Sequence, residues 1–90
     1  MSSDQNGQRV LLVDDEPLIL SSYRRTLHDC GVQLLLAEGP KDALIILEQQ
    51  QPIDVVVADY RMPGMNGDAF LERVRERWPD TVRILVTAYT

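Results

Sequence analysis

Four short apolar runs, separated by segments with helical periodicity, most constrain what this chain can fold into. The runs read RVLLV, VQLLLA, IDVVVA and TVRILVTA, and they cover residues 9–13, 32–37, 53–58 and 81–88. Their apolar and polar residues alternate little, which is typical of strands buried on both faces of a parallel sheet. The pattern therefore predicts an α/β domain built on a doubly wound parallel sheet.

The three segments between these runs place apolar residues three or four positions apart, as one face of a helix requires. We expect helices over residues 16–30, 40–51 and 67–78. Pro17 and Pro40 suit the first turn of a helix, and Gly31 suits a C-terminal cap. Ninety residues allow a single domain. In the first helix the expected apolar stripe consists of Leu20, Tyr23, Leu27 and Cys30.

Composition excludes several classes of function. The net charge of −5 argues against a surface that binds nucleic acid. No apolar run approaches the roughly 20 residues that cross a bilayer, so no membrane partner is expected. One cysteine, Cys30, cannot form an intramolecular disulfide, which fits a cytoplasmic location. Together with the single histidine, His28, it cannot fill a tetrahedral zinc site.

The first residues, MSSDQNGQ, lack the basic and apolar regions of a signal peptide. They are interpreted as a short disordered leader over residues 1–8, followed by one domain over residues 9–90.

Polar side chains follow three of the predicted strands. Asp14 and Asp15 come directly after the first strand, Asp59 ends the third, and Thr87 ends the fourth. In an open parallel sheet, the carboxyl ends of the strands form the ligand crevice where the strand order reverses. If the first and third strands are neighbours, the three carboxylates converge in that crevice.

Convergence of carboxylates has an energetic cost. Two carboxylates about 5 Å apart repel by roughly 3 kcal/mol at an effective dielectric constant of 20, so a proton or a cation must relieve the charge. Oxygen ligands without histidine or thiolate suit a hard ion, Mg²⁺ or alternatively Mn²⁺. The simpler interpretation is that Asp15 or Glu16 caps the helix that begins near Pro17. Three acids on two strands favour the ion.

The stretches LLVDDEP, VVVADYRMPGMNG and ILVTAY closely resemble the receiver domain of two-component response regulators. The resemblance covers residues 9–89 and includes an acidic pair after the first strand. It also includes an Asp followed four residues later by Pro63 and eight later by Gly67. It implies a flavodoxin-like sheet, here of order 2-1-3-4, and a role in phosphorelay signal transduction.

The resemblance also implies roles for individual residues. Asp59 would accept a phosphoryl group from a sensor histidine kinase or a phosphotransfer protein. Asp14, Asp15, Asp59 and the backbone carbonyl of Arg61 would hold Mg²⁺. Thr87 would be the switch hydroxyl that reads the phosphoryl group. Such a domain is a signalling module and is not expected to be a turnover enzyme.

The sequence departs from the family pattern after its fourth strand. The resemblance implies that the fourth helix, fifth strand and fifth helix are lacking, together with the site lysine on the fifth strand. Lys41, the only lysine, cannot take that role because it lies at the start of the second helix. The fourth strand then becomes a bare apolar edge, so we expect a homodimer or a larger assembly.

Two alternative functions stay open from the sequence. Without the site lysine, the domain could dock a partner and accept no phosphoryl group. A phosphohydrolase of the haloacid dehalogenase type also uses an Asp after its first strand with Mg²⁺. That pattern requires a second acid two residues later, which Asp14 and Glu16 satisfy, but Pro17 follows and no lysine motif is present.

Overall fold

A computed structural model describes residues 8–87 as one four-stranded parallel sheet with three helices. The strand order is β2-β1-β3-β4, which confirms the predicted fold. The elements are β1 (Arg9–Val13), α1 (Pro17–Leu27), β2 (Gln33–Ala37), α2 (Pro40–Gln49), β3 (Val55–Asp59), α3 (Gly67–Arg77) and β4 (Val82–Val86).

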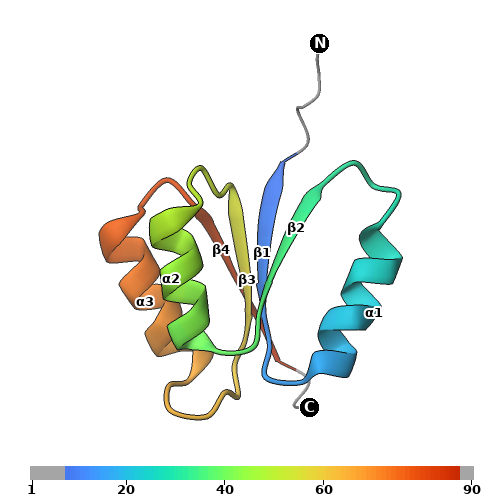
Figure 1. The fold of residues 1–90 in the computed structure, drawn as a ribbon. Coiled ribbons are helices and arrows are strands. Elements are labelled where there is room, and N and C mark those ends of the chain that lie inside the picture. The colour runs from blue at the N-terminus through green and yellow to red at the C-terminus, as the bar shows by residue number, and fades with distance from the viewer. Residues whose placement is uncertain (1–7, 88–90) are drawn as a thin grey trace.

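The register of the sheet brings β1 and β3 to its centre. Leu12 of β1 lies beside Leu36 of β2 on one side and Val57 of β3 on the other. The strands run parallel, so their carboxyl ends meet at one edge of the sheet. Helix α1 covers one face, whereas α2 and α3 lie together on the opposite face (Figure 1). The two central strands therefore deliver the residues that follow them to the same place.

The main hydrophobic core lies between the sheet and the α2–α3 layer. Every second residue of the central strands points into it, as the pleat of a β-strand requires. From the helices come Ala43, Leu47, Phe70 and Val74, all fully buried. The complete core consists of Leu11, Val13, Ala37, Ala43, Leu47, Ile53, Val56, Ala58, Met62, Phe70, Leu71 and Val74.

The face of the sheet on the α1 side is only partly covered. Leu12 and Leu20 are buried where α1 packs on the sheet. On β4, Val82 and Ile84 are 55% and 44% exposed, although they lie on the same face as Leu12 by register. Within residues 8–87, the outer edge of β4 pairs with no further strand. An apolar surface is therefore open beside α1.

The end of α1 differs from the prediction. The helix ends at Leu27, not at residue 30, and Cys30 is exposed, so it is not part of the apolar stripe. A turn follows, in which the backbone N–H of Cys30 donates to the carbonyl of Leu27 at 3.1 Å. Gly31 has a φ of 77°, so the glycine serves the turn into β2 and does not cap the last helical residue.

No helix within residues 8–87 is long and apolar enough to cross a membrane. The predicted leader over residues 1–8 lies almost wholly outside the described residues, so its disorder stays a prediction.

Candidate functional site

The pairing of β1 with β3 positions two acids at the carboxyl edge of the sheet. Val13 pairs with Ala58, so the next residues on the two strands are Asp14 and Asp59. The backbone of each acid is also held by the strand on its other side, β2 for Asp14 and β4 for Asp59. The N–H of Asp14 donates to the carbonyl of Ala37 at 3.1 Å, and Asp59 pairs in register with β4. Both carboxylates therefore extend from backbone that the sheet fixes.

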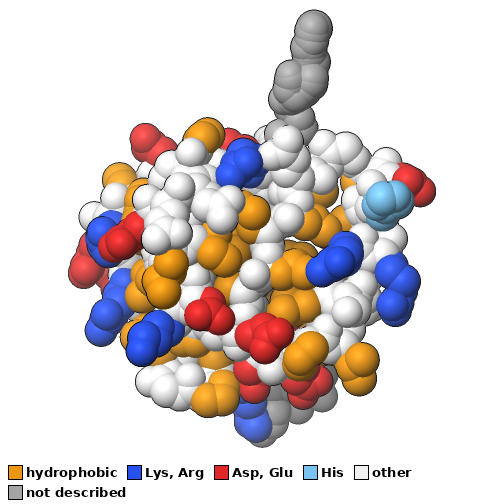
Figure 2. Space-filling model, viewed as in Figure 1, with side chains coloured by type: hydrophobic (Ala, Val, Ile, Leu, Met, Phe, Trp, Pro, Cys, Tyr) orange, Lys and Arg blue, Asp and Glu red, His pale blue; other side chains and the backbone are white. Residues whose placement is uncertain are grey.

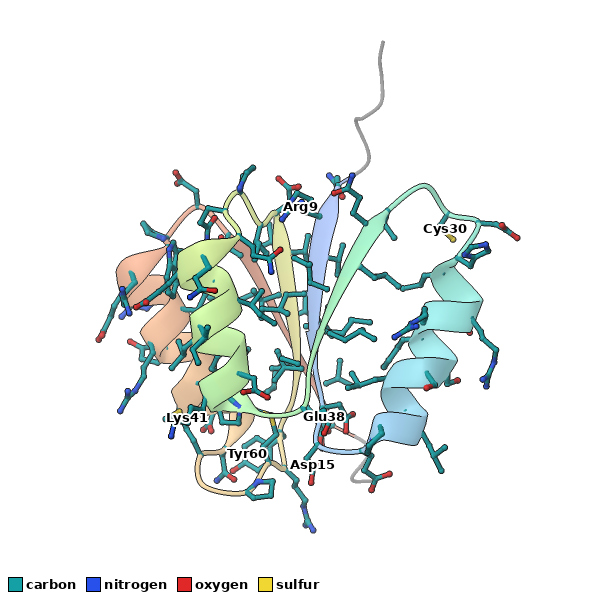
Figure 3. All side chains as sticks on the ribbon, viewed as in Figure 1. Arg9, Asp15, Cys30, Glu38, Lys41 and Tyr60 are labelled. Atoms are coloured by element: carbon teal, nitrogen blue, oxygen red, sulfur yellow. The ribbon has the colours of Figure 1, made fainter. Side chains whose placement is uncertain are left out.

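The three predicted acids lie together. Asp14, Asp15 and Asp59 each offer a carboxylate oxygen, and these atoms all lie within 4.8 Å of one another. Asp14 and Asp59 are half-buried, whereas Asp15 is exposed. Figure 2 shows acidic side chains gathered over this end of the strands. Figure 3 shows Asp15 and Glu38 at this end of the sheet and Arg9 at the opposite end.

The electrostatics of the cluster are unfavourable for a bare set of carboxylates. Burial raises the pKa of the Asp14 carboxyl, and the negative charges of Asp59, Asp15 and Glu16 raise it further. The backbone N–H of Glu16 donates to Asp14 Oδ1 at 2.9 Å and opposes part of this rise in pKa. Ionised Asp14 is therefore short of a positive partner, and a cation would supply one.

The geometry does not support helix capping as the purpose of these acids. Glu16 is the N-cap of α1 and makes no side-chain capping hydrogen bond. Asn66, not Asp59, is the N-cap of α3. Among the described residues, Asp14 accepts a side-chain hydrogen bond from the turn before α1 alone, and this bond goes to Oδ1. The carboxylates thus converge without being used by the helices that follow them.

A tight loop joins Asp59 to α3. Gly64 has a φ of 86°, a left-handed conformation that favours glycine. The N–H of Gly67 donates to the carbonyl of Tyr60 at 2.8 Å, and the N–H of Tyr60 donates to the carbonyl of Val86 at 2.8 Å. These bonds fasten the start of α3 to the ends of β3 and β4. The loop therefore fixes the backbone of Tyr60, the residue that follows Asp59.

Two residues that the sequence reasoning missed line the acidic cleft. Tyr23 of α1 and Val86 of β4 border a cleft of about 230 Å³ together with Asp14 and Asp59. The sequence pattern predicts Tyr23 only as a member of the apolar stripe of α1. The sequence does carry one indication of this position. Ile19 also lines the cleft, and Tyr23 lies four residues after it, so the two side chains share a face of the helix. The described residues that line this cleft include no lysine or arginine.

Thr87 and Arg61 lie beside this cleft and do not line it. They border a neighbouring cleft of about 410 Å³ with Tyr60 and Leu85. The structure thus brings the three acids together. Thr87, which follows the last residue of β4, borders the neighbouring cleft instead. Lys41 lies on α2, in the lining of a different cleft.

Comparison with known proteins gives the same family for nearly the whole chain. The family model for the response regulator receiver domain matches residues 10–90. The hydrogenase transcriptional regulatory protein HoxA of Cupriavidus necator is 42% identical over 81 residues, which cover 90% of this chain and 16% of that protein. The DNA-binding transcriptional regulator NtrC of Salmonella typhimurium is 35% identical, with 90% and 17% covered. The chain spans about a sixth of the length of these relatives.

Solved structures agree with the sequence relatives. The signal receiver domain of an HD domain-containing protein from Pseudomonas fluorescens superposes with a TM-score of 0.87 at 30% identity, covering 91% of this chain and 65% of that one. The response regulator TrrA of Thermotoga maritima, solved in complex with Mg²⁺ and BeF, gives a TM-score of 0.85 at 34% identity, with 92% and 71% covered. With this fold and these motifs, the chain belongs to the receiver domain family of two-component response regulators.

Proposed function

We propose that this receiver domain accepts a phosphoryl group on Asp59 from the phosphohistidine of a sensor histidine kinase or a phosphotransfer protein. Asp59 is half-buried at the end of a central strand, where it pairs in register with β4, and the backbone of Tyr60 after it bonds to Val86 and Gly67. Phosphoryl transfer requires accurate positioning and neutralisation of charge more than covalent machinery. A carboxylate on a rigid strand meets the first requirement.

The second requirement is met by a divalent cation. The donor set fits Mg²⁺, because three carboxylates offer oxygens within 4.8 Å of one another and burial disfavours the charge of Asp14. Asp14, Asp15 and Asp59 would hold the ion, with the backbone carbonyl of Arg61 as the further ligand that the family pattern implies. When bound, Mg²⁺ would neutralise charge on the phosphoryl oxygens.

The reaction conserves atoms and charge in one displacement. An oxygen of Asp59 forms the new O–P bond while the N–P bond of the phosphohistidine breaks, and the imidazole leaves with the bonding electrons and takes up a proton. Thr87, beyond the end of β4, would then donate a hydrogen bond to the phosphoryl group after moving inward from the neighbouring cleft. The cluster of acids on two adjacent strands is the observation that carries this proposal.

Acetyl phosphate and Mg²⁺ provide a direct test on the 90-residue chain. We expect intact-mass spectrometry to show the gain of one phosphoryl group that hydroxylamine removes, as an acyl phosphate requires. Asp59→Asn should abolish the gain, whereas Asp80→Asn, which changes an exposed acid far along the chain, should not. Label that persists in Asp59→Asn would place the acceptor on another residue.

The same experiment separates this function from the docking alternative. A folded wild-type chain that gains no phosphoryl group, and that also fails to bind beryllofluoride, would be a module that only binds a partner. Membership of the receiver family leaves the haloacid dehalogenase alternative without support.

A further inference from the structure

A further cleft, separate from the acidic cleft and from the one beside Thr87, lies between the start of α2 and the loop that precedes α3. Its volume is about 530 Å³, within the range typical of small-molecule sites. Leu44 and Met65, both half-buried, contribute apolar side chains to its lining, and Pro40 and Pro63 add to them. The cleft therefore offers an apolar surface to a ligand.

Two cationic side chains line the same cleft, Lys41 from α2 and Arg73 from α3. Within residues 8–87, neither makes an ion pair or a hydrogen bond. Their neighbours on α3 differ, because Arg75 pairs with Glu72 and Arg77 pairs with Glu48. Figure 3 shows Lys41 near the start of α2, apart from Asp15. Two cations without partners beside an apolar lining favour a ligand that carries negative charge.

Two acids in the lining limit how much charge the ligand can bring. Glu38 and Asp42 belong to the same cleft and are both exposed. With Lys41 and Arg73 they make the formal charge of the lining zero. A polyanion such as a nucleoside triphosphate would be repelled by the two acids, and the lining has no excess of positive charge to offset this repulsion. A ligand with one carboxylate and an apolar body matches the lining best.

We propose that this cleft binds an amphiphilic monocarboxylate, with the carboxylate between Lys41 and Arg73 and the apolar chain against Leu44 and Met65. The site is distinct from the acidic cluster. Its lining nevertheless includes Pro63, Gly64 and Met65, which belong to the loop between Asp59 and α3. A bound ligand would restrict that loop.

Octanoate, titrated into the ¹⁵N-labelled 90-residue chain without Mg²⁺ or phosphodonor, tests the proposal. We expect amide shifts to concentrate at Gly39, Lys41, Gly64 and Met65, with a dissociation constant of about 1 mM, the scale for so small a ligand. Octanol, which has an alkyl chain of the same length but no charge, should bind more weakly than octanoate. This readout does not involve phosphorylation, so its failure would leave the proposed role of Asp59 unaffected.

Charge variants locate the carboxylate. Lys41→Gln and Arg73→Gln should each weaken octanoate binding by about 1.5- to fivefold, the range for an exposed ion pair. Arg24→Gln removes an equal charge from α1 and should leave binding unchanged. The proposal would be overturned by unchanged affinity in both cleft variants, by shifts centred on Val82 and Ile84 of the open sheet face, or by no shifts up to saturation with octanoate. In the spectrum of each variant, the amide signals of residues outside the cleft report whether the fold is intact.

Discussion

Gly67, the first residue of α3, lies directly against the backbone of Asp59. A Cβ atom at position 67 would stand 2.3 Å from the carbonyl oxygen of Asp59 and 2.9 Å from Leu85 Cδ1. Backbone cannot move aside as a flexible side chain can, so only glycine allows α3 to begin this close to β3. The same contact aligns the N–H of Gly67 with the carbonyl of Tyr60. The helix thereby supports the strand end that carries the proposed acceptor.

Gly67→Ala should destabilise the domain by about 1–3 kcal/mol, the usual cost of overpacking a closely packed position. Urea unfolding followed by circular dichroism measures this loss. Gly39→Ala is the matched control, because a Cβ there meets nothing within 4 Å and its backbone is extended. Equal losses in the two variants would show that the contact with Asp59 is not the cause.

Asp14→Asn should make the metal-free domain more stable at neutral pH, by about 1 kcal/mol after solvent screening of these partly exposed charges. The pKa of Asp14 is raised in the folded state above its ordinary value of 3.8. A raised carboxyl pKa favours folding fully below pH 3.8, and this contribution is lost as the pH rises through the folded pKa. The advantage of the variant should thus be absent at pH 3 and grow above pH 4. Asn keeps an oxygen for the N–H of Glu16.

The check is a series of urea unfolding curves between pH 3 and pH 7 in the presence of a chelator. Asp29→Asn, which changes an exposed acid after α1, is the control. An advantage of Asp14→Asn that does not vary with pH would exclude titration of the Asp14 carboxyl as its origin.

Asp15→Asn should weaken Mg²⁺ binding about tenfold or more, because the variant lacks a carboxylate that is proposed to bind the ion. Asp15 is the exposed member of the cluster, so the change should leave the free energy of unfolding without metal nearly constant. Calorimetry is the suitable measurement. Trp78 follows the last residue of α3, with the Arg77 guanidinium 4.7 Å from its ring, so its fluorescence is a poor reporter of the acidic end. Equal affinities in variant and wild type would contradict the assignment.

Much of this arrangement could be predicted from the sequence, because it follows from periodicity and strand ends. Asp14 follows and Asp59 ends an apolar run of the length and composition typical of a buried strand, and parallel strands end at one edge. The end of α1 could not be placed, because Leu27 and Cys30 fit one helical face equally well. Periodicity alone does not show that a turn begins at His28.

Long-range contacts of single side chains were also beyond prediction. Arg9 donates from Nε to the carbonyl of Pro52, from Nη2 to the carbonyl of Gln50 and from Nη1 to Gln33 Oε1. This network closes the amino end of the sheet, yet nothing in the spacing of these residues indicates it. The crowding at Gly67 is hidden for the same reason, since it depends on how closely two elements approach.

Thr87→Ala should leave phosphorylation of Asp59 largely intact and weaken the structural response to it. The Thr87 hydroxyl is proposed to donate a hydrogen bond to the phosphoryl group, whereas Asp59 is the residue that accepts this group. Amide shifts on adding beryllofluoride and Mg²⁺ measure the response, with Thr26→Ala on the exposed surface of α1 as the control. A full response in Thr87→Ala, equal to that of wild type, would remove Thr87 from the switch.

The 90-residue chain should self-associate through β4. Val82, Ile84 and Leu85 are all more than 40% exposed, and within residues 8–87 the outer edge of β4 has no partner strand. Because these residues face water, solvent satisfies their backbone groups, and the driving force is burial of apolar side chains, about 1 kcal/mol for each half-exposed one. A second copy that pairs along this edge would gain both the burial and the backbone hydrogen bonds.

Light scattering coupled to size exclusion should therefore show a dimer or a larger species that dissociates on dilution. Val82→Lys places a charge on the exposed apolar face of the edge strand and should shift the chain toward monomer. Ile45→Lys is the matched control, because Ile45 is 47% exposed but lies on α2, on the other face of the sheet. A wild-type chain that is monomeric at all concentrations and melts cooperatively would refute this expectation. It would mean that the three helices and the four strands are sufficient to support the domain.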